Sequence, residues 1–144
     1  MKARFEIIPY GSEKWKEAVR LREGILRAPF GLKFTSEELE EEKSHIQIAG
    51  LIDDKIIATT VLVPEPDAFK MQRVVVAEKL RSSNIGSDMM AFCEDYILRS
   101  NRTSVYCHAR DSAVNFYLRN SYSPEGDYFD EDGIPHLKMK KVLR

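Results

Sequence analysis

The sequence predicts a mixed α/β domain in which helices cover both faces of a central sheet. Segments rich in β-branched residues alternate along the chain with amphipathic segments of helical period. The resulting order is a strand, two helices, three strands, a helix, a strand, a helix and two strands, and such an order is typical of a layered α/β architecture. The length of 144 residues suits one domain, and we expect residues 1–144 to form it.

The N-terminal part of the chain is predicted to contain a strand and two helices. Residues 3–10 alternate between polar and apolar side chains, as a half-buried strand does. Residues 12–27 carry apolar side chains at helical spacing, and Ser12 is a favourable N-cap for that helix. The acidic stretch at residues 35–43 is predicted to be a shorter helix, because it opens with Thr-Ser and either residue can cap it.

The middle of the chain is predicted to form three strands and a long helix. Two β-branched stretches, residues 44–54 and 55–64, meet at two consecutive aspartates, which is a good signal for a hairpin turn. Residues 68–77 follow a Pro-containing turn and form the third strand. Residues 84–100 present apolar side chains on one surface at helical spacing, which indicates an amphipathic helix.

The C-terminal part is predicted to contain a strand at residues 103–110, a short helix at 111–120 and strands at 122–130 and 135–143. Asp111 or Ser112 is the expected N-cap of the short helix. The last two strands form a hairpin around the sequence Glu-Asp-Gly, whose residue types favour a tight turn.

Composition excludes several functional classes. The net charge of −1 argues against a nucleic-acid partner bound by bulk electrostatics. No apolar run approaches the roughly 20 residues that cross a bilayer, so we expect no membrane partner. Cys93 and Cys107 lack metal-site spacing, and we expect both to be small buried side chains in a reducing cytoplasm.

The stretch VVVAEKLRSSNIGSDMM carries the strongest functional signal. An apolar strand ends, a short loop follows, and a helix begins near Gly86. Backbone N–H groups at such a helix start can bind a diphosphate, helped by the helix dipole. A nucleotide P-loop would need a Gly-Lys-Ser/Thr ending, and a dinucleotide fingerprint would need three spaced glycines. The stretch contains neither.

This stretch resembles the acetyl-CoA loop of the GNAT acyltransferases, Gln/Arg-x-x-Gly-x-Gly/Ala. Its six positions are occupied in order by Arg81, Ser82, Ser83, Asn84, Ile85 and Gly86. Asn84 stands where the first glycine is usual, and asparagine tolerates a positive φ better than most residues. The later segment AVNFYLRNSY resembles the GNAT pattern Ala-x-x-Phe-Tyr-x-x-x-Gly-Phe, with Ser121 and Tyr122 in place of Gly-Phe.

The predicted element order is also that of the GNAT superfamily. The resemblance implies a mixed, mostly antiparallel sheet of six to seven strands flanked by about four helices. Two branches look similar to this chain. The ElaA-like branch shares the ending DGIPH, and the glyphosate N-acetyltransferase-like branch shares LREGILR, CHARDS and PHLKM.

The resemblance implies acetyl-CoA as a co-substrate and no metal. It assigns the pyrophosphate to backbone amides from Arg81 to Ser87. It places the pantetheine arm along the strand Val74, Val75 and Val76, with the N–H of Val75 or Val76 available to the thioester oxygen. From the residues alone, three valines also fit a buried central strand.

Two residues are candidates for proton transfer. The resemblance assigns Tyr117 as the acid for the departing thiolate, and a phenol with a reference pKa of about 10 stays protonated at neutral pH. His136 is the candidate base, since the resemblance to the glyphosate N-acetyltransferase-like branch gives this histidine that role. Strand alternation alone places His136 on an outer, partly exposed face beside Lys138. His45 and His108 are rivals that we expect to be structural or pocket-wall residues.

Three arginines are candidates for substrate binding, namely Arg27, Arg73 and Arg110. Arg73 interrupts an apolar strand, which is costly unless its guanidinium meets an anion or a partner. The resemblance implies that the three arginines clasp an anionic substrate. The alternative is structural pairing with acidic residues, above all those in the run 38–42. Arg110 also stands where many GNAT members have an asparagine that contacts the cofactor arm.

These observations predict a cytoplasmic N-acetyltransferase that acts on a small amine with an acidic group, such as a carboxylate or phosphonate. The amine would attack the thioester directly. The alternatives are acetylation of a cationic amine or a peptide N-terminus, and a CoA-binding module without catalysis. The protein would be a monomer or a homodimer.

Overall fold

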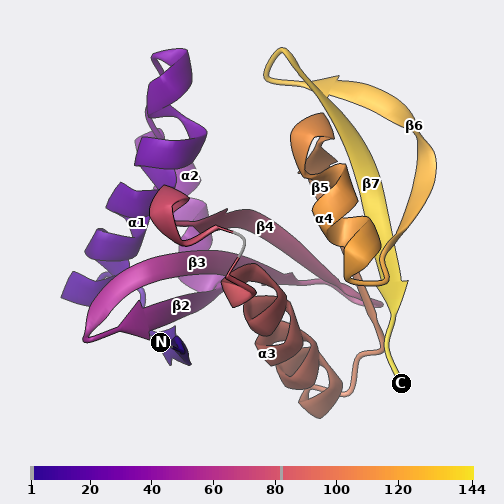
Figure 1. Cartoon of the computed structure of the whole chain (residues 1–144), viewed down its shortest axis with the longest axis horizontal. Helices are drawn as coiled ribbons and strands as arrows, with labels where there is room; N and C mark the ends of the chain where they lie inside the picture. The colour runs from indigo at the N-terminus through magenta and orange to yellow at the C-terminus, as the bar shows by residue number, and fades with distance from the viewer. Residues whose placement is uncertain (1, 82) are drawn as a thin grey trace.

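The computed structural model describes residues 2–81 and 83–144 and contains a seven-stranded sheet in the order β1-β2-β3-β4-β5-β7-β6 (Figure 1). In chain order its strands and α-helices are β1 (Arg4–Ile8), α1 (Glu13–Leu26), α2 (Ser36–Glu41), β2 (Ile46–Ile52), β3 (Lys55–Pro64), β4 (Phe69–Val76), α3 (Ile85–Arg99), β5 (Ser104–Arg110), α4 (Val114–Arg119), β6 (Ser123–Glu131) and β7 (Ile134–Val142). Neighbouring strands are antiparallel except for β4 and β5, which are parallel. The predicted fold class and element order are confirmed.

Local signals in the sequence explain most element boundaries. The Ser12 hydroxyl accepts a backbone N–H of the first turn of α1, as predicted for its N-cap. Thr35 caps α2 and forms a reciprocal capping box with Glu38. Asp53 and Asp54 both have positive φ, 50° and 62°, and they turn the chain between β2 and β3.

The predicted N-cap of the short helix α4 is wrong. A 3₁₀ turn over Asp111–Ala113 precedes α4, and the N-cap is Ala113, which makes no side-chain cap bond. The Asp111 carboxylate accepts the N–H of the adjacent Ser112 at 2.9 Å. The Asp111 carboxylate therefore binds a backbone N–H within the 3₁₀ turn and not one in the first turn of α4.

The helices lie on both faces of the sheet and define two hydrophobic cores (Figure 1). The larger core lies beneath α3 and α4 and contains Met89, Met90 and Tyr117. The smaller core lies between α1 and the β1–β3 part of the sheet and is centred on Trp15 and Ala49. Cys93 and Cys107 are buried and free, as expected from the sequence. Each large side chain buried in these cores contributes roughly 1.5–3 kcal/mol to stability.

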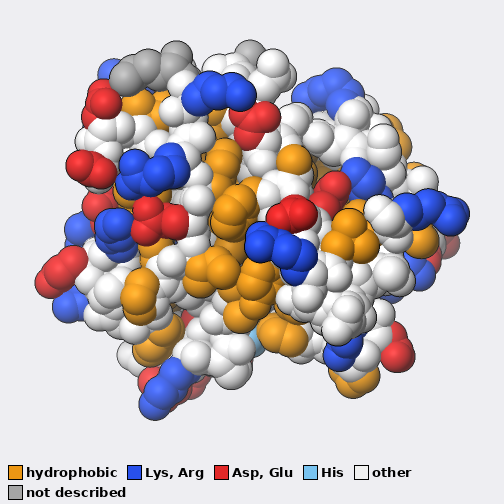
Figure 2. Space-filling model, turned by 90° about the horizontal axis from the view of Figure 1, so that it is seen from below, with side chains coloured by type: hydrophobic (Ala, Val, Ile, Leu, Met, Phe, Trp, Pro, Cys, Tyr) orange, Lys and Arg blue, Asp and Glu red, His pale blue; other side chains and the backbone are white. Residues whose placement is uncertain are grey.

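Charges of both signs lie close together on the molecular surface. On the face that Figure 2 shows, hydrophobic side chains form a band across the middle, and cationic and acidic side chains are interspersed on either side of it. Among the helices that the structure describes, none is long and apolar enough to cross a membrane.

The sheet opens between its two parallel strands. β4 and β5 pair at Phe69–Val105 and Lys70–Tyr106, at one end of each strand, and then diverge (Figure 1). A β-bulge interrupts the register between β3 and β4, and Arg73 lies in it with a φ of 54°. A bulge bends its strand and changes the direction of its side chains. The opening between β4 and β5 is where the predicted site residues meet.

Candidate active site

A cavity of about 1180 Å³ lies where β4 and β5 diverge, and nearly all the predicted site residues line it. Those on its wall are Arg27, Arg73, Val74, Val75, Val76, Arg81, Asn84, Gly86, Ser87, Arg110, Tyr117 and His136. Ser82 lies outside the described residues. The Ile85 side chain is in the larger core, and the Ser83 hydroxyl donates to the Leu80 carbonyl, so neither side chain lines the cavity.

The start of α3 forms one end of the cavity. Asn84 is its N-cap with a φ of 66°, which explains why glycine is usual at this position and why asparagine is accepted. Gly86 packs against α4, since a Cβ there would come within 2.9 Å of the Phe116 ring. The helix start can therefore approach α4 closely only without a side chain at this position. Ser121 likewise has a φ of 70°, where the resemblance expects glycine.

The valines at the cavity edge of β4 differ in the direction of their backbone N–H groups. Ala77 donates its N–H to the Ile57 carbonyl on β3, at 2.7 Å. Because N–H groups alternate between the two edges of a strand, the N–H of Val75 also points toward β3, and that of Val76 points to the cavity. The Val76 carbonyl accepts a hydrogen bond from Arg81 Nε at 3.2 Å. This agrees with the orientation, because the N–H and C=O of one strand residue point to the same edge. Of the two predicted donors to a thioester oxygen, Val76 has the suitable direction.

Tyr117 lies between the larger core and the cavity. It is 4% exposed and packs edge-on against Phe116 and Tyr122. Burial, followed by the interaction with Cys107, raises the pKa of Tyr117 well above its ordinary value. The hydroxyl therefore stays protonated and can donate to an anion that develops in the cavity.

His136 is buried against the cavity and is only 5% exposed, so the outer-face placement that strand alternation suggested is wrong. Its Nδ1 lies 2.8 Å from the Ile134 carbonyl. A carbonyl only accepts hydrogen bonds, so Nδ1 carries the proton of the neutral ring. Nε2 is then the basic nitrogen, and it lies 3.5 Å from a carboxylate oxygen of Glu131.

The rival histidines occupy different positions. His108 lines the cavity, and burial is the main cause that lowers its pKa, followed by the charge of Lys70. His45 is not on the cavity wall, and its buried Nδ1 has no hydrogen-bond partner among the residues that the structure describes. Burial also lowers the pKa of His45.

Arg27 and Arg73 pair with Glu38 at the cavity wall. Both Arg27 terminal nitrogens contact the Glu38 carboxylate, at 3.0 and 2.5 Å, and Arg73 Nη2 lies 3.6 Å from it. Both guanidiniums lie over the Phe34 ring. The hydrogen bonds from Arg27 are the main cause that lowers the pKa of Glu38 from 4.5 to about 2. Their stabilising contribution is therefore complete above pH 4.5 and is lost as the pH falls through about 2.

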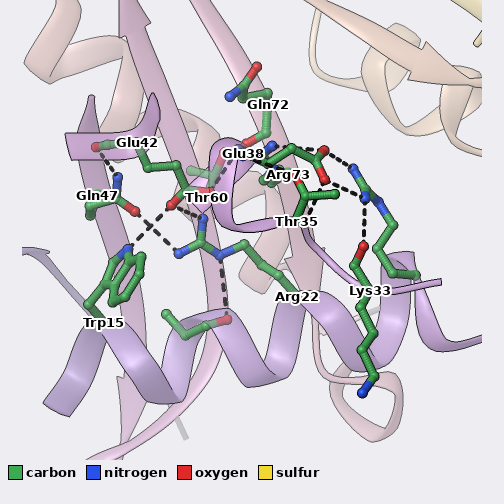
Figure 3. Close-up of polar contacts among 12 residues, drawn as sticks. Trp15, Arg22, Lys33, Thr35, Glu38, Glu42, Gln47, Thr60, Gln72 and Arg73 are labelled. Carbon is green, nitrogen blue, oxygen red and sulfur yellow. Dashed lines mark hydrogen bonds and ion pairs between the residues drawn. The ribbon is translucent and has the colours of Figure 1, made fainter. Parts of the chain in front are cut away.

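The pairs continue into the interior through Glu42 (Figure 3). Arg73 Nη1 lies 2.7 Å from Glu42 Oε2, and Arg22 Nη1 lies 3.0 Å from Glu42 Oε1. Trp15 and Gln47 complete the hydrogen bonds around Arg22 and Glu42, both of which are fully buried. This chain of alternating charges fixes α1 and α2 to the bulge of β4. It agrees with the structural pairing that the sequence left open for these arginines.

Arg110 differs from the other two arginines. It donates to the Leu26 carbonyl at 2.8 Å and lies over the Phe30 ring, and no carboxylate within 4.0 Å pairs with it among residues 2–81 and 83–144. Burial, followed by the charge of Arg27, lowers its pKa. Arg110 is directly opposite His136 in the pairing of β5 and β7. Both residues line the cavity.

The sequence matches the family model of the acetyltransferase (GNAT) domain over residues 16–143, which is most of the chain. The chain belongs to the GNAT acetyltransferase family. The predicted class of enzyme, an acyltransferase, is thereby confirmed.

Relatives and solved structures agree with this family. The chain is 28% identical to the ElaA protein of Escherichia coli over 111 residues, which cover 74% of this chain and 71% of ElaA. A crystal structure of a putative N-acetyltransferase from Lactobacillus plantarum has a TM-score of 0.85 and 23% identity, with 97% of this chain and 99% of that chain covered. A GNAT family acetyltransferase from Elizabethkingia anophelis, solved with acetyl-CoA bound, has a TM-score of 0.73 and 14% identity, with 99% of each chain covered.

Two carboxylates in this GNAT domain lie beside the predicted site residues, and one of them, Glu131, was not predicted from the sequence. Glu38 belongs to the acidic run 38–42 that the sequence offered as partners for the arginines, and it pairs with Arg27 and Arg73. Glu131 lies between His108 and His136, and the Glu-Asp-Gly turn that contains it indicated only a hairpin. Both carboxylates line the cavity.

Proposed function

We propose that this GNAT-family protein transfers an acetyl group from acetyl-CoA to the amine of a small acceptor that bears one acidic group. The observation that carries the proposal is the pairing of Arg110 with His136 across β5 and β7, with both side chains on the cavity wall. Directly opposed residues have Cβ atoms about 5 Å apart. One small molecule can therefore reach both, with its acid at Arg110 and its amine at His136.

The cavity wall has residues suited to acetyl-CoA. The amides at the start of α3, around Gly86 and Ser87, suit a pyrophosphate, and the glycine leaves the backbone accessible. The loop from Arg81 onward would supply the remaining amides. The open edge of β4 would hold the pantetheine arm, with the Val76 N–H directed at the thioester oxygen. When bound, acetyl-CoA supplies the acetyl group in activated form, as a thioester.

Two side chains would move the protons. His136 would accept a proton from the acceptor amine at Nε2, the nitrogen left basic by the bond between Nδ1 and Ile134. Tyr117 would donate to the departing thiolate, because burial keeps its hydroxyl protonated. These groups lie on different elements, β7 and α4, and both line the cavity.

The pairing of two arginines limits the charge of the acceptor. Glu38 and Glu42 offset the charges of Arg27 and Arg73. Part of the N–H donors of these two arginines are therefore already used and are not free for the acceptor. Arg110 keeps donors for a carboxylate or phosphonate. An acceptor with a single acidic group fits this arrangement better than one with several.

A cationic amine without an acid is the second candidate, because Glu131 and Asp132 also line the cavity. A matched set of acceptors separates the two. We would measure thiol release from acetyl-CoA with an α-amino acid, with its decarboxylated amine and with its α-hydroxy acid analogue. Preference for the amino acid supports the proposal, and turnover with the decarboxylated amine alone contradicts it. Cofactor binding without turnover on any amine would identify a non-catalytic CoA-binding module.

Replacing Arg110 with glutamine is expected to raise the KM for the amino-acid acceptor by about 10- to 100-fold. This is the usual loss of affinity when one hydrogen bond to a charged group is removed. The KM for acetyl-CoA should not change. Turnover of the decarboxylated amine should also persist, because that amine lacks the group that Arg110 binds. Arg20→Gln, an exposed change outside the cavity, is the control. An equal loss on both acceptors would show that Arg110 supports the fold and does not select the acid.

Replacing Tyr117 with phenylalanine is expected to lower kcat by about 100-fold or more, the range for loss of a general acid. The ring and its packing against Phe116 and Tyr122 are retained. The loss should be smaller with an acetyl thioester whose thiol is more acidic, since that leaving group needs less help. Equal losses with both thioesters would argue against the acid role.

A further inference from the structure

Glu131 lies at the end of β6, between two histidines of the cavity wall. Its Oε1 is 3.2 Å from His108 Nδ1, and its Oε2 is 3.5 Å from His136 Nε2. The carboxylate is 45% exposed, so a small molecule in the cavity can reach it. Nothing in the proton-transfer scheme above uses this residue.

The positions of the ring hydrogens of His108 and His136 follow from the oxygen atoms beside them, which can only accept hydrogen bonds. His108 lines the cavity, and its Nδ1 lies 3.2 Å from Glu131 Oε1; a carboxylate oxygen accepts, so Nδ1 carries a hydrogen. His108 thus donates to Glu131 and fixes that carboxylate. The proton of His136 is on Nδ1, facing Ile134. When His136 is neutral, its Nε2 and Glu131 Oε2 are two acceptors 3.5 Å apart with no hydrogen between them.

We propose that Glu131 is a specificity-determining residue that binds the acceptor in its ammonium form, together with Nε2 of His136. An R–NH₃⁺ group has three donors and can satisfy both acceptors at once, whereas a hydroxyl has one donor and no charge. This inference rests on the proposed function and deepens it. The acceptor class becomes a zwitterion whose ammonium lies at Glu131 and whose acid lies at Arg110.

The same contact would assist the proton transfer. One N–H bond of the ammonium breaks and one N–H bond forms at His136 Nε2, so the positive charge moves from the substrate to the imidazole. Glu131 then faces an imidazolium in place of an ammonium, and the charge pair is kept throughout. The amine is left with the lone pair that it needs for attack.

Other charged groups surround this cluster. Arg110 comes from β5, Lys70 from β4 and Asp132 from the turn before β7, and Lys138 of β7 is directly opposite His108. The charge of Lys138 is offset by an ion pair with Glu125 of β6, at 2.9 Å. In the described part of the chain, no group of three or more His, Cys, Asp or Glu side chains is arranged to hold a metal ion.

The test compares Glu131→Gln with Glu125→Gln, a matched change on the same strand that faces Lys138 and Lys140 and not the histidines. Glu131→Gln is expected to raise the KM for the amine acceptor by about 10- to 100-fold, with little change in the KM for acetyl-CoA. Inhibition by the α-hydroxy acid analogue should not weaken, because it carries no ammonium. Glu131→Asp should recover part of the loss.

The pH–rate profile provides a second readout. Without the Glu131 charge, protonation of His136 is less favourable, so the acidic limb of kcat/KM should move to lower pH in Glu131→Gln. A Glu131→Gln protein that matches Glu125→Gln in KM and in pH profile would overturn this inference alone. A wild-type protein that acetylates no amine would overturn the proposed function, and this inference with it.

Discussion

Replacing Glu42 with glutamine is expected to lower the free energy of unfolding by about 3–5 kcal/mol, the usual cost of breaking a buried ion pair from one side. Arg22 is fully buried, and Glu42 is the carboxylate that it contacts, at 3.0 Å. The same carboxylate accepts hydrogen bonds from Trp15 Nε1 at 3.3 Å and Arg73 Nη1 at 2.7 Å. Glutamine keeps the size of the side chain but leaves a buried guanidinium without a counter-charge.

Urea unfolding measures this effect, with Glu41→Gln as the control because Glu41 is its exposed neighbour. The control should change stability by less than about 0.5 kcal/mol. The double variant Arg22→Met/Glu42→Gln should be more stable than Glu42→Gln alone, since it no longer buries an unpaired charge. Equal stability of the Glu42→Gln and Glu41→Gln proteins would contradict the structural role given to this chain of charges.

Replacing His136 with glutamine is expected to lower kcat by about 100- to 10,000-fold, the range for loss of a general base. The ring has one basic nitrogen, Nε2, because Ile134 holds the proton on Nδ1. Glutamine can keep a polar contact to that carbonyl but cannot accept a proton from an ammonium. Binding of acetyl-CoA should be unchanged, since the α3 start and the edge of β4 remain in place.

The rival histidines provide the comparison. His45→Gln should retain nearly full activity, because His45 does not line the cavity. His108→Gln should raise the KM for the amine more than it lowers kcat, because His108 acts by fixing Glu131. A His108→Gln protein with the kcat loss expected of His136→Gln would reassign the base.

Much of the fold could be predicted because its boundaries depend on local chemistry. The Ser12 cap, the capping box of Thr35 and the aspartate turn at Asp53 each involve residues within a few positions of one another. Asn84 could even be interpreted as a residue with positive φ, and its φ is 66°. The one wrong cap, at Asp111, arose where a 3₁₀ turn competes with the first turn of α4.

The site could be predicted less completely, because its partners come from distant parts of the chain. Glu38 meets Arg73 and Glu131 meets His108 only because of how the strands are ordered and how far β4 and β5 diverge. Alternation suggested an outer, partly exposed face for His136, because it could not show that a cavity and not solvent covers that side chain. Only the resemblance to the GNAT family implied that His136 faces a site, because it assigned roles in one site to His136, Tyr117 and the three arginines.

The pH dependence of kcat/KM for the amino-acid acceptor, in the wild-type and His136→Gln proteins, tests the central claim most directly. The wild-type rate should fall as the pH drops through the titration of the base. In His136→Gln this acidic limb should disappear and leave a low, nearly flat rate. An acidic limb of unchanged position and steepness in His136→Gln would contradict the account, because another group would then accept the proton from the acceptor amine.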